Sequence, residues 1–228
     1  MSNHHQYVND AISLLSELGV YRTPKDTWAF TDLEIASSCY IHHSRMPVAI
    51  TAYAAIDPVF AAGRIPNYTL VNLVDKTPCM DGIEYTALAM ICGVQPPIFP
   101  SDLRGEVFGN TAWQIVNDYQ LESCFIQVRA YGSQGRHFTM RPQGFNWEQS
   151  TPIPAILTTM RKSYRSMTPI QQIMVLTLMH LYHQGPDKCF LIGGCPTKIP
   201  AAEALRILRR DGRALTIWAH LVCHYAGW

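Results

Sequence analysis

The chain has 228 residues, of which 48% are apolar and 15% charged, whereas an ordinary soluble domain is about 25% charged. No apolar run reaches the roughly 18 residues of a membrane span, and the N-terminus lacks the basic and apolar regions of a signal peptide, so we predict a cytoplasmic protein without a membrane partner. Residues 1–100 hold five basic against nine acidic side chains, and residues 101–228 hold thirteen against eight, which indicates that the second half meets an anion such as nucleic acid.

The first part of the chain is expected to mix helices with short strands. Apolar residues over 8–18 recur at helical spacing, and Gly19 is placed to end that helix. Short helices are expected between residues 31 and 63, and the alternation over 68–74 predicts a strand. The apolar run over 82–94 fits a buried helix or a strand, while Thr111 is a suitable N-cap for a helix ending near Tyr119.

Residues 123–141 are predicted to form a basic β-hairpin, because apolar and polar side chains alternate on either side of a glycine-containing turn at 132–135. The hairpin would gather four basic side chains with a tyrosine beside them: Arg129, Arg136, His137 and Arg141, with Tyr131. Such a surface suits phosphate and base contact, although an ordinary hairpin with solvated arginines has the same pattern.

The remaining chain is predicted to be helical over residues 153–165, 168–185, 200–212 and 213–225, with a short strand over 189–192. Two groups of cations lie on these helices. The first helix has a basic edge formed by Arg161, Lys162 and Arg165. The third presents a stripe of guanidinium groups suited to the nucleic-acid backbone, formed by Arg206, Arg209, Arg210 and Arg213, for which a solvated face is the alternative.

These elements predict an α+β fold in two parts. Residues 1–150 form a mixed domain with a small antiparallel sheet that includes the basic hairpin, and residues 151–228 form a helical C-terminal domain.

Metal and catalytic motifs are weak. The candidate ligands are His220, Cys223 and His224, His180 with His183, and Cys39 with His42, but none supplies two ligand pairs at zinc spacing. The seven cysteines show no CxxC and are expected to be reduced thiols, and no GxSxG, P-loop, HExxH or GxGxxG is present. We predict no metal, no cofactor and no catalysis; a Cys–His hydrolase is the enzymatic alternative.

From Glu122 to Ile170 the chain has an apolar strand (CFIQVRAY), a polar turn and a basic residue with histidine on a return strand (RHFTMRP), before a long helical C-terminus. This order resembles the PAM-reading large-subunit family of type IV CRISPR effector complexes, although many members have a cysteine-rich zinc finger and this chain has no CxxC. The resemblance implies a non-catalytic subunit of an antiviral ribonucleoprotein that contacts guide RNA, target DNA beside the protospacer, and other protein subunits. The alternative is a plasmid- or phage-encoded protein-interaction or regulatory module.

Overall fold

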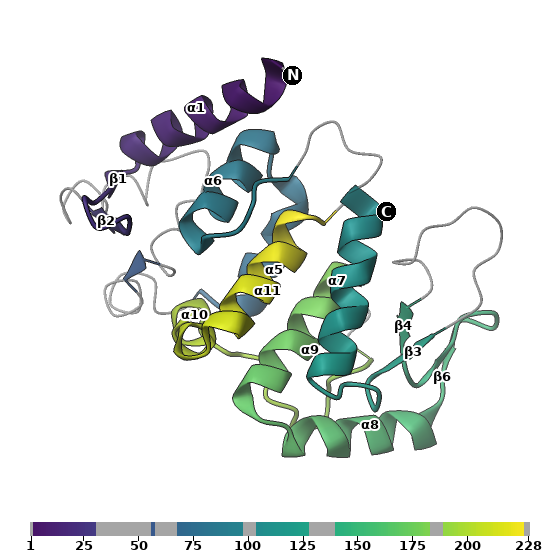
Figure 1. The fold of residues 1–228 in the computed structure, drawn as a ribbon. Coiled ribbons are helices and arrows are strands. Elements are labelled where there is room, and N and C mark those ends of the chain that lie inside the picture. The colour runs from purple at the N-terminus through teal and green to yellow at the C-terminus, as the bar shows by residue number, and fades with distance from the viewer. Residues whose placement is uncertain are drawn as a thin grey trace.

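The computed structural model describes residues 2–30, 56–57, 68–97, 104–127, 140–182 and 189–225. Within them the chain is mainly helical, with two-stranded antiparallel sheets at its periphery, which confirms the α+β class (Figure 1). The elements of the first half are α1 (Ser2–Glu17), β1 (Val20–Arg22), β2 (Trp28–Phe30), α5 (Leu70–Lys76), a 3-10 turn (Thr77–Cys79), α6 (Gly82–Cys92) and α7 (Arg104–Asp118). The elements that follow are β3 (Phe125–Gln127), β4 (Met140–Pro142), β5 (Phe145–Asn146), β6 (Thr151–Pro152), α8 (Pro154–Ser166), α9 (Pro169–Tyr182), α10 (Ala201–Arg210) and α11 (Gly212–Cys223).

Helices from both halves of the chain share one apolar core. Helix α6 packs against α1 and α11, α7 packs against α11, and α5 packs against α9 and α10. Trp218 of α11 is fully buried, and its indole N–H donates a hydrogen bond of 2.9 Å to the hydroxyl of Thr177 on α9. The apolar character of α11 is therefore explained by its central position.

Several helix boundaries are confirmed. Helix α1 covers all but the last residue of the predicted stretch, and Gly19 lies two residues after its end with a φ of 72°, a conformation that favours glycine. Helix α9 begins with a capping box: Gln171 accepts from the backbone N–H of Thr168 at 2.9 Å, and Thr168 accepts from that of Gln171 at 3.4 Å. The helices expected between residues 31 and 63 lie outside the described residues.

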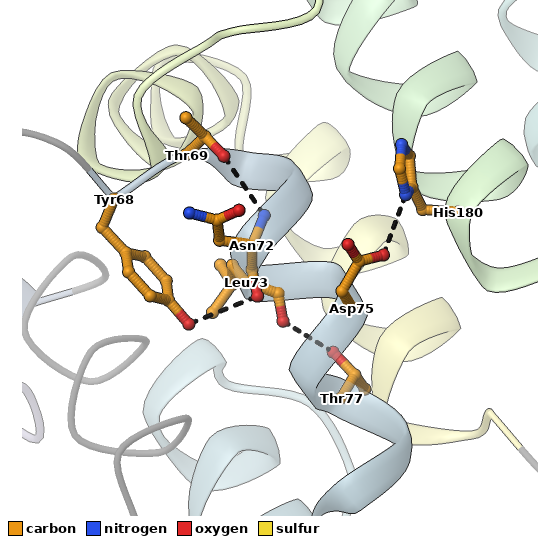
Figure 2. Close-up of polar contacts among 7 residues, drawn as sticks. All are labelled: Tyr68, Thr69, Asn72, Leu73, Asp75, Thr77 and His180. Carbon is orange, nitrogen blue, oxygen red and sulfur yellow. Dashed lines mark hydrogen bonds and ion pairs between the residues drawn. The ribbon is translucent and has the colours of Figure 1, made fainter. Parts of the chain in front are cut away.

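The strand predicted over residues 68–74 is wrong, because Thr69 is the N-cap of helix α5 and the residues that follow it are helical (Figure 2). The hydroxyl of Thr69 accepts from the backbone N–H of Asn72 at 3.2 Å and so caps the helix. Leu70, Leu73 and Val74 are all buried and stand at helical spacing on one face. Burial of that face against α9 and α10 outweighs the preference of this segment, which is rich in β-forming residues, for a strand.

The ambiguous run over residues 82–94 is helix α6, which a local signal specifies. The Asp81 carboxylate accepts from the backbone N–H groups of Ile83 and Glu84 at 2.9 Å, and Glu84 accepts from that of Asp81 at 2.8 Å. This capping box satisfies N–H groups that have no partner inside the helix. Gly93 ends the helix with a φ of 69°.

Two further predictions are wrong. Helix α7 begins at Arg104, so Thr111 lies inside the helix, where its hydroxyl donates to the Val107 carbonyl at 2.9 Å and caps nothing. Among the described residues the segment 189–192 is not a strand. The Cys189 and Phe190 carbonyls instead accept hydrogen bonds from Arg161 of α8, so a side chain takes the place of a neighbouring strand.

The two ends of the predicted hairpin pair in antiparallel fashion. Strand β3 pairs with β4 so that Phe125 lies opposite Pro142, Ile126 opposite Arg141, and Gln127 opposite Met140. Residues 128–139, including the predicted turn, lie outside the described residues, so the complete basic hairpin stays a prediction. The segment after β4 contains one further antiparallel pair, β5 with β6.

No helix within the described ranges combines the length and apolar character needed to cross a bilayer.

Candidate nucleic-acid interface

The β3–β4 pair turns one face to the core and the other outward. Phe125, Met140 and Pro142 are buried. Ile126 and Arg141 are partners on the opposite face, where Ile126 is 37% exposed. Successive side chains of a strand point to opposite faces, so Arg141 has to lie on the outer face once its neighbours enter the core.

Arg141 lies over the ring of Trp147. The guanidinium carbon is 5.5 Å from the centroid of the indole ring, and the side chain donates a hydrogen bond of 3.1 Å to the Met140 carbonyl. Such a cation–π contact contributes about 0.5–1 kcal/mol at an exposed site. Trp147 nevertheless keeps 36% of its surface exposed.

Two phenylalanines hold Trp147 from within the protein. The Phe145 ring is 4.8 Å from the indole ring, and the Phe190 ring lies 6.5 Å away and within 23° of parallel. Phe190 is only 3% exposed and packs in the core. Trp147 is thus the outermost member of an aromatic cluster whose inner member is immobilised by burial.

The chain reaches this position through a tight local structure. Gly144 has a φ of 87°, and a Cβ at this residue would lie 2.5 Å from a methyl carbon of Leu157 on α8. The Asn146 side chain then accepts from the backbone N–H groups of Glu148 and Gln149 at 3.1 Å, an Asx turn that closes the β5–β6 connection. The close approach at Gly144 and this turn together fix Trp147 beside α8.

The basic edge of α8 binds the segment after α9. Arg161 donates to the carbonyls of Phe190, at 2.8 Å, and Cys189, and Arg165 donates to the Gly193 carbonyl at 3.2 Å. Carbonyl oxygens carry no formal charge, so these guanidinium groups keep their positive charge. Lys162 is exposed and forms no hydrogen bond or ion pair with any residue that the structure describes.

The cations of α10 and α11 are arranged differently. Arg206 donates to the Glu203 carboxylate at 2.7 Å, and Arg213 pairs with Asp118 at 2.6 Å. The Arg206 guanidinium lowers the pKa of the Glu203 carboxyl group, so the pair stays ionised. Arg209 donates to the Ile56 carbonyl at 3.0 Å, and Arg210 is exposed.

These four arginines do not form one uncompensated stripe. Helix α10 ends at Arg210, and Asp211 caps α11, so Arg213 belongs to the next helix. Carboxylates neutralise Arg206 and Arg213. Helix α10 also lies on the opposite side of the view from β3 and β4 (Figure 1). The arginines of α10 and Arg141 of β4 therefore occupy separate parts of the molecule.

The structure therefore brings some of the predicted site residues together. Arg141, Trp147, Phe190 and Arg161 form one chain of contacts. We call these residues, together with Lys162 and Arg165 of the same helix α8, the Trp147 surface. Four predicted residues lie outside the described part of the chain: Arg129, Tyr131, Arg136 and His137. Trp147 and Phe190 were missed by the sequence analysis, although two aromatic residues soon after a basic strand, in the FNW segment, were a usable signal for Trp147.

The histidine candidates for a metal site form pairs in the described structure. His180 lies 2.8 Å from the Asp75 carboxylate (Figure 2), and the rings of His220 and His224 lie 4.1 Å apart. Among the described residues, no three His, Cys, Asp or Glu side chains come together as a possible metal site. Cys39, His42 and His183 lie outside the described ranges.

The described cysteines include two thiols that burial protects from ionisation. Burial raises the pKa of Cys92 and of Cys124 to about 12. A thiolate is the reactive form of cysteine, so neither residue is suited to act as a nucleophile near neutral pH.

The comparisons with known proteins leave the family open. No protein-family model matches the chain, and neither the curated proteins nor the solved structures include a match.

Proposed function

We propose that the protein is a non-catalytic, nucleic-acid-binding subunit of an RNA-guided complex. Within the residues that the structure describes, the Trp147 surface is where it would contact the nucleic acid. The observation that carries this proposal is the exposed Trp147 ring under the Arg141 guanidinium, connected through Phe190 to Arg161 of α8. Aromatic rings and cations in one surface supply the two contacts that nucleic-acid-binding proteins use, base stacking and phosphate neutralisation.

The charge distribution supports this location over α10. A phosphate gains most from a cation that no carboxylate neutralises, because only then is the full charge available to displace counterions. Arg161 and Arg165 bond to uncharged carbonyls, whereas Arg206 and Arg213 bond to carboxylates. We therefore assign the described contacts to β4 and α8, and give α10 at most a minor part through Arg209 and Arg210.

The type of complex is proposed from the sequence resemblance. A large subunit of the type IV CRISPR kind would contact the duplex beside the protospacer and the start of the guide RNA, while base pairing supplies most of the specificity. The residues over 128–139 would add Arg129, Arg136 and His137 to the same contact. Other protein subunits would be its neighbours.

A charge reversal tests the surface. We expect Arg141→Glu combined with Lys162→Glu to weaken binding of a labelled oligonucleotide and to reduce the dependence of affinity on salt, by roughly 0.7–0.9 in the log–log slope for each phosphate that is no longer neutralised. Lys25→Glu combined with Lys76→Glu is the matched control, since both lysines are exposed, Lys25 in the β1–β2 turn and Lys76 at the end of α5. Fluorescence anisotropy over a series of salt concentrations measures both effects.

Two outcomes would contradict the proposal. One is equal loss of affinity in the test and control pairs, which would show that only overall charge matters. The other is a wild-type protein without any salt-dependent affinity for RNA or DNA, which would favour a protein-interaction module.

The double variant Arg129→Glu with Arg136→Glu tests the hairpin contribution separately. Purification from cells under native conditions, with analysis of bound RNA of defined length, tests the assignment to an RNA-guided complex.

A further inference from the structure

We infer that Trp147 is a stacking site for an unpaired base, so that the nucleic acid at this surface is single-stranded where it meets β4 and β5. This inference rests on the proposed function and specifies that the ligand at this surface is a single-stranded nucleic acid. Its starting point is the exposure of the indole ring: 36% of Trp147 remains exposed although Phe145, Phe190 and Arg141 contact it.

The ring is held in place before any ligand binds. The Phe190 ring is nearly parallel to it and is itself buried, and the Asx turn at Asn146 restrains the backbone that carries it. A side chain that is already immobile loses little conformational entropy on binding, which favours a contact that depends on one exposed ring.

Stacking on this ring requires a base that has left the double helix. Bases in a duplex are covered above and below by their neighbours and offer only their edges in the grooves. An unpaired base exposes its π-face, which stacks on aromatic side chains without regard to sequence. An exposed indole ring therefore binds single-stranded nucleic acid in preference to a duplex, and it does not select a particular base.

The charges on β4 and α8 fit a polyanion. Arg141 lies 5.5 Å from the indole centroid, and Arg165 and Lys162 are exposed on α8. Glu148, one residue after Trp147, is the acidic side chain of the turn. Cations outnumber it on the described surface, so charge complementarity favours a polyanion over a neutral proline-rich peptide. Nucleic acid is the polyanion that also supplies bases to stack on the indole ring.

The first experiment compares a labelled single strand of twelve thymidines with a duplex of equal length. Stacking on an aromatic ring contributes about 1–3 kcal/mol per base, which corresponds to a loss of about 5- to 150-fold in single-strand affinity for Trp147→Ala. Duplex affinity should not change, and Trp147→Phe should retain most of the affinity, because a phenyl ring still stacks.

The second experiment uses intrinsic fluorescence and does not depend on the alanine variant folding. The single strand should quench part of the wild-type tryptophan emission, and that part should be absent in Trp147→Phe. Trp113→Phe is the matched control, since this partly buried residue lies on α7. Quenching that persists in Trp147→Phe, or that disappears in Trp113→Phe instead, would overturn the inference.

The two proposals fail in different ways. If the single strand binds with a salt-dependent affinity that Arg141→Glu with Lys162→Glu weakens but Trp147→Ala does not, the stacking inference is wrong and the proposed function stands. If neither strand nor duplex binds, the proposed function fails and the inference with it. Equal losses on strand and duplex in Trp147→Ala would show a general structural role for the ring and contradict the stacking role.

Discussion

At the residue scale, the hydrogen bonds around His220 specify where its proton lies. The Thr111 hydroxyl donates to the Val107 carbonyl, so it accepts from Nδ1–H of His220 at 3.0 Å. Nε2 is then the deprotonated nitrogen of a neutral ring. Burial lowers the pKa of His220, and the ring of His224 lies 4.1 Å away.

This arrangement predicts a loss of stability on acidification. In the unfolded chain His220 takes up its second proton near its ordinary pKa of about 6.5, whereas in the folded protein it does so at a lower pH. The unfolded state therefore binds more protons below that value, and the free energy of unfolding falls as the pH drops. Denaturant unfolding at several pH values between 7.5 and 5 measures this decline.

A substitution isolates the contribution of His220. His220→Gln keeps a side-chain donor for Thr111 and removes the titration, so its stability should depend less steeply on pH than that of the wild type. His180→Gln is the control, because His180 lies beside Asp75 on the surface of α9. An unchanged slope in His220→Gln would show that other groups cause the acid sensitivity.

At the element scale, Gly144 determines how β5 meets α8. The residue combines a φ of 87° with a position where a Cβ would lie 2.5 Å from Leu157. Gly193 has a similar φ of 69° but nothing within 4 Å of its Cβ position. Alanine substitutions at the two glycines therefore separate the free-energy cost of the left-handed backbone from the free-energy cost of the close approach to Leu157.

We expect Gly144→Ala to destabilise the protein more than Gly193→Ala. A strained left-handed residue costs about 1–3 kcal/mol, and both variants incur that cost. Gly144→Ala must in addition displace a branched side chain of the core, and it should disturb the packing of Trp147. Urea unfolding gives the two free energies, and near-ultraviolet circular dichroism reports the aromatic cluster. Equal destabilisation would mean that Leu157 adapts without cost.

The sequence predicted helix ends correctly where a capping residue lies next to the end. It failed where burial against other elements determines the secondary structure. The helix start predicted at residue 168 and the helix stop predicted at Gly19 depend on residues close by in the chain, and the structure confirms both. The stretch that became α5 alternates like a strand, but its burial against α9 and α10 makes it a helix. Thr111 has the chemistry of an N-cap, yet α7 already extends seven residues before it.

At the scale of the whole molecule, the halves on either side of residue 150 contact each other extensively. Helix α9 packs on α5, and α11 packs on α6 and α7. The domain boundary at residue 150 stays a prediction, because it concerns which residues fold independently. These contacts lead us to expect that the two halves lose structure together.

We therefore expect one cooperative unfolding transition, with tryptophan fluorescence and far-ultraviolet circular dichroism giving the same midpoint in urea. Two-state behaviour is common when elements share one core. Two separated transitions would instead support independent domains over 1–150 and 151–228. Expression of residues 151–228 alone is the complementary measurement, since this fragment would expose the apolar faces of α9 and α11.

The sequence by itself determined the α+β class, the order of the later helices and the presence of cations in the second half, because periodicity, caps and charge are local properties of a chain. Only the tertiary structure decided which cations remain uncompensated. Arg206 and Arg213 meet carboxylates, while Arg161 and Arg165 meet carbonyls. It also placed Trp147 against Phe190, a contact between residues far apart in the chain. Such pairings depend on how elements pack in space, and no window of neighbouring residues encodes them.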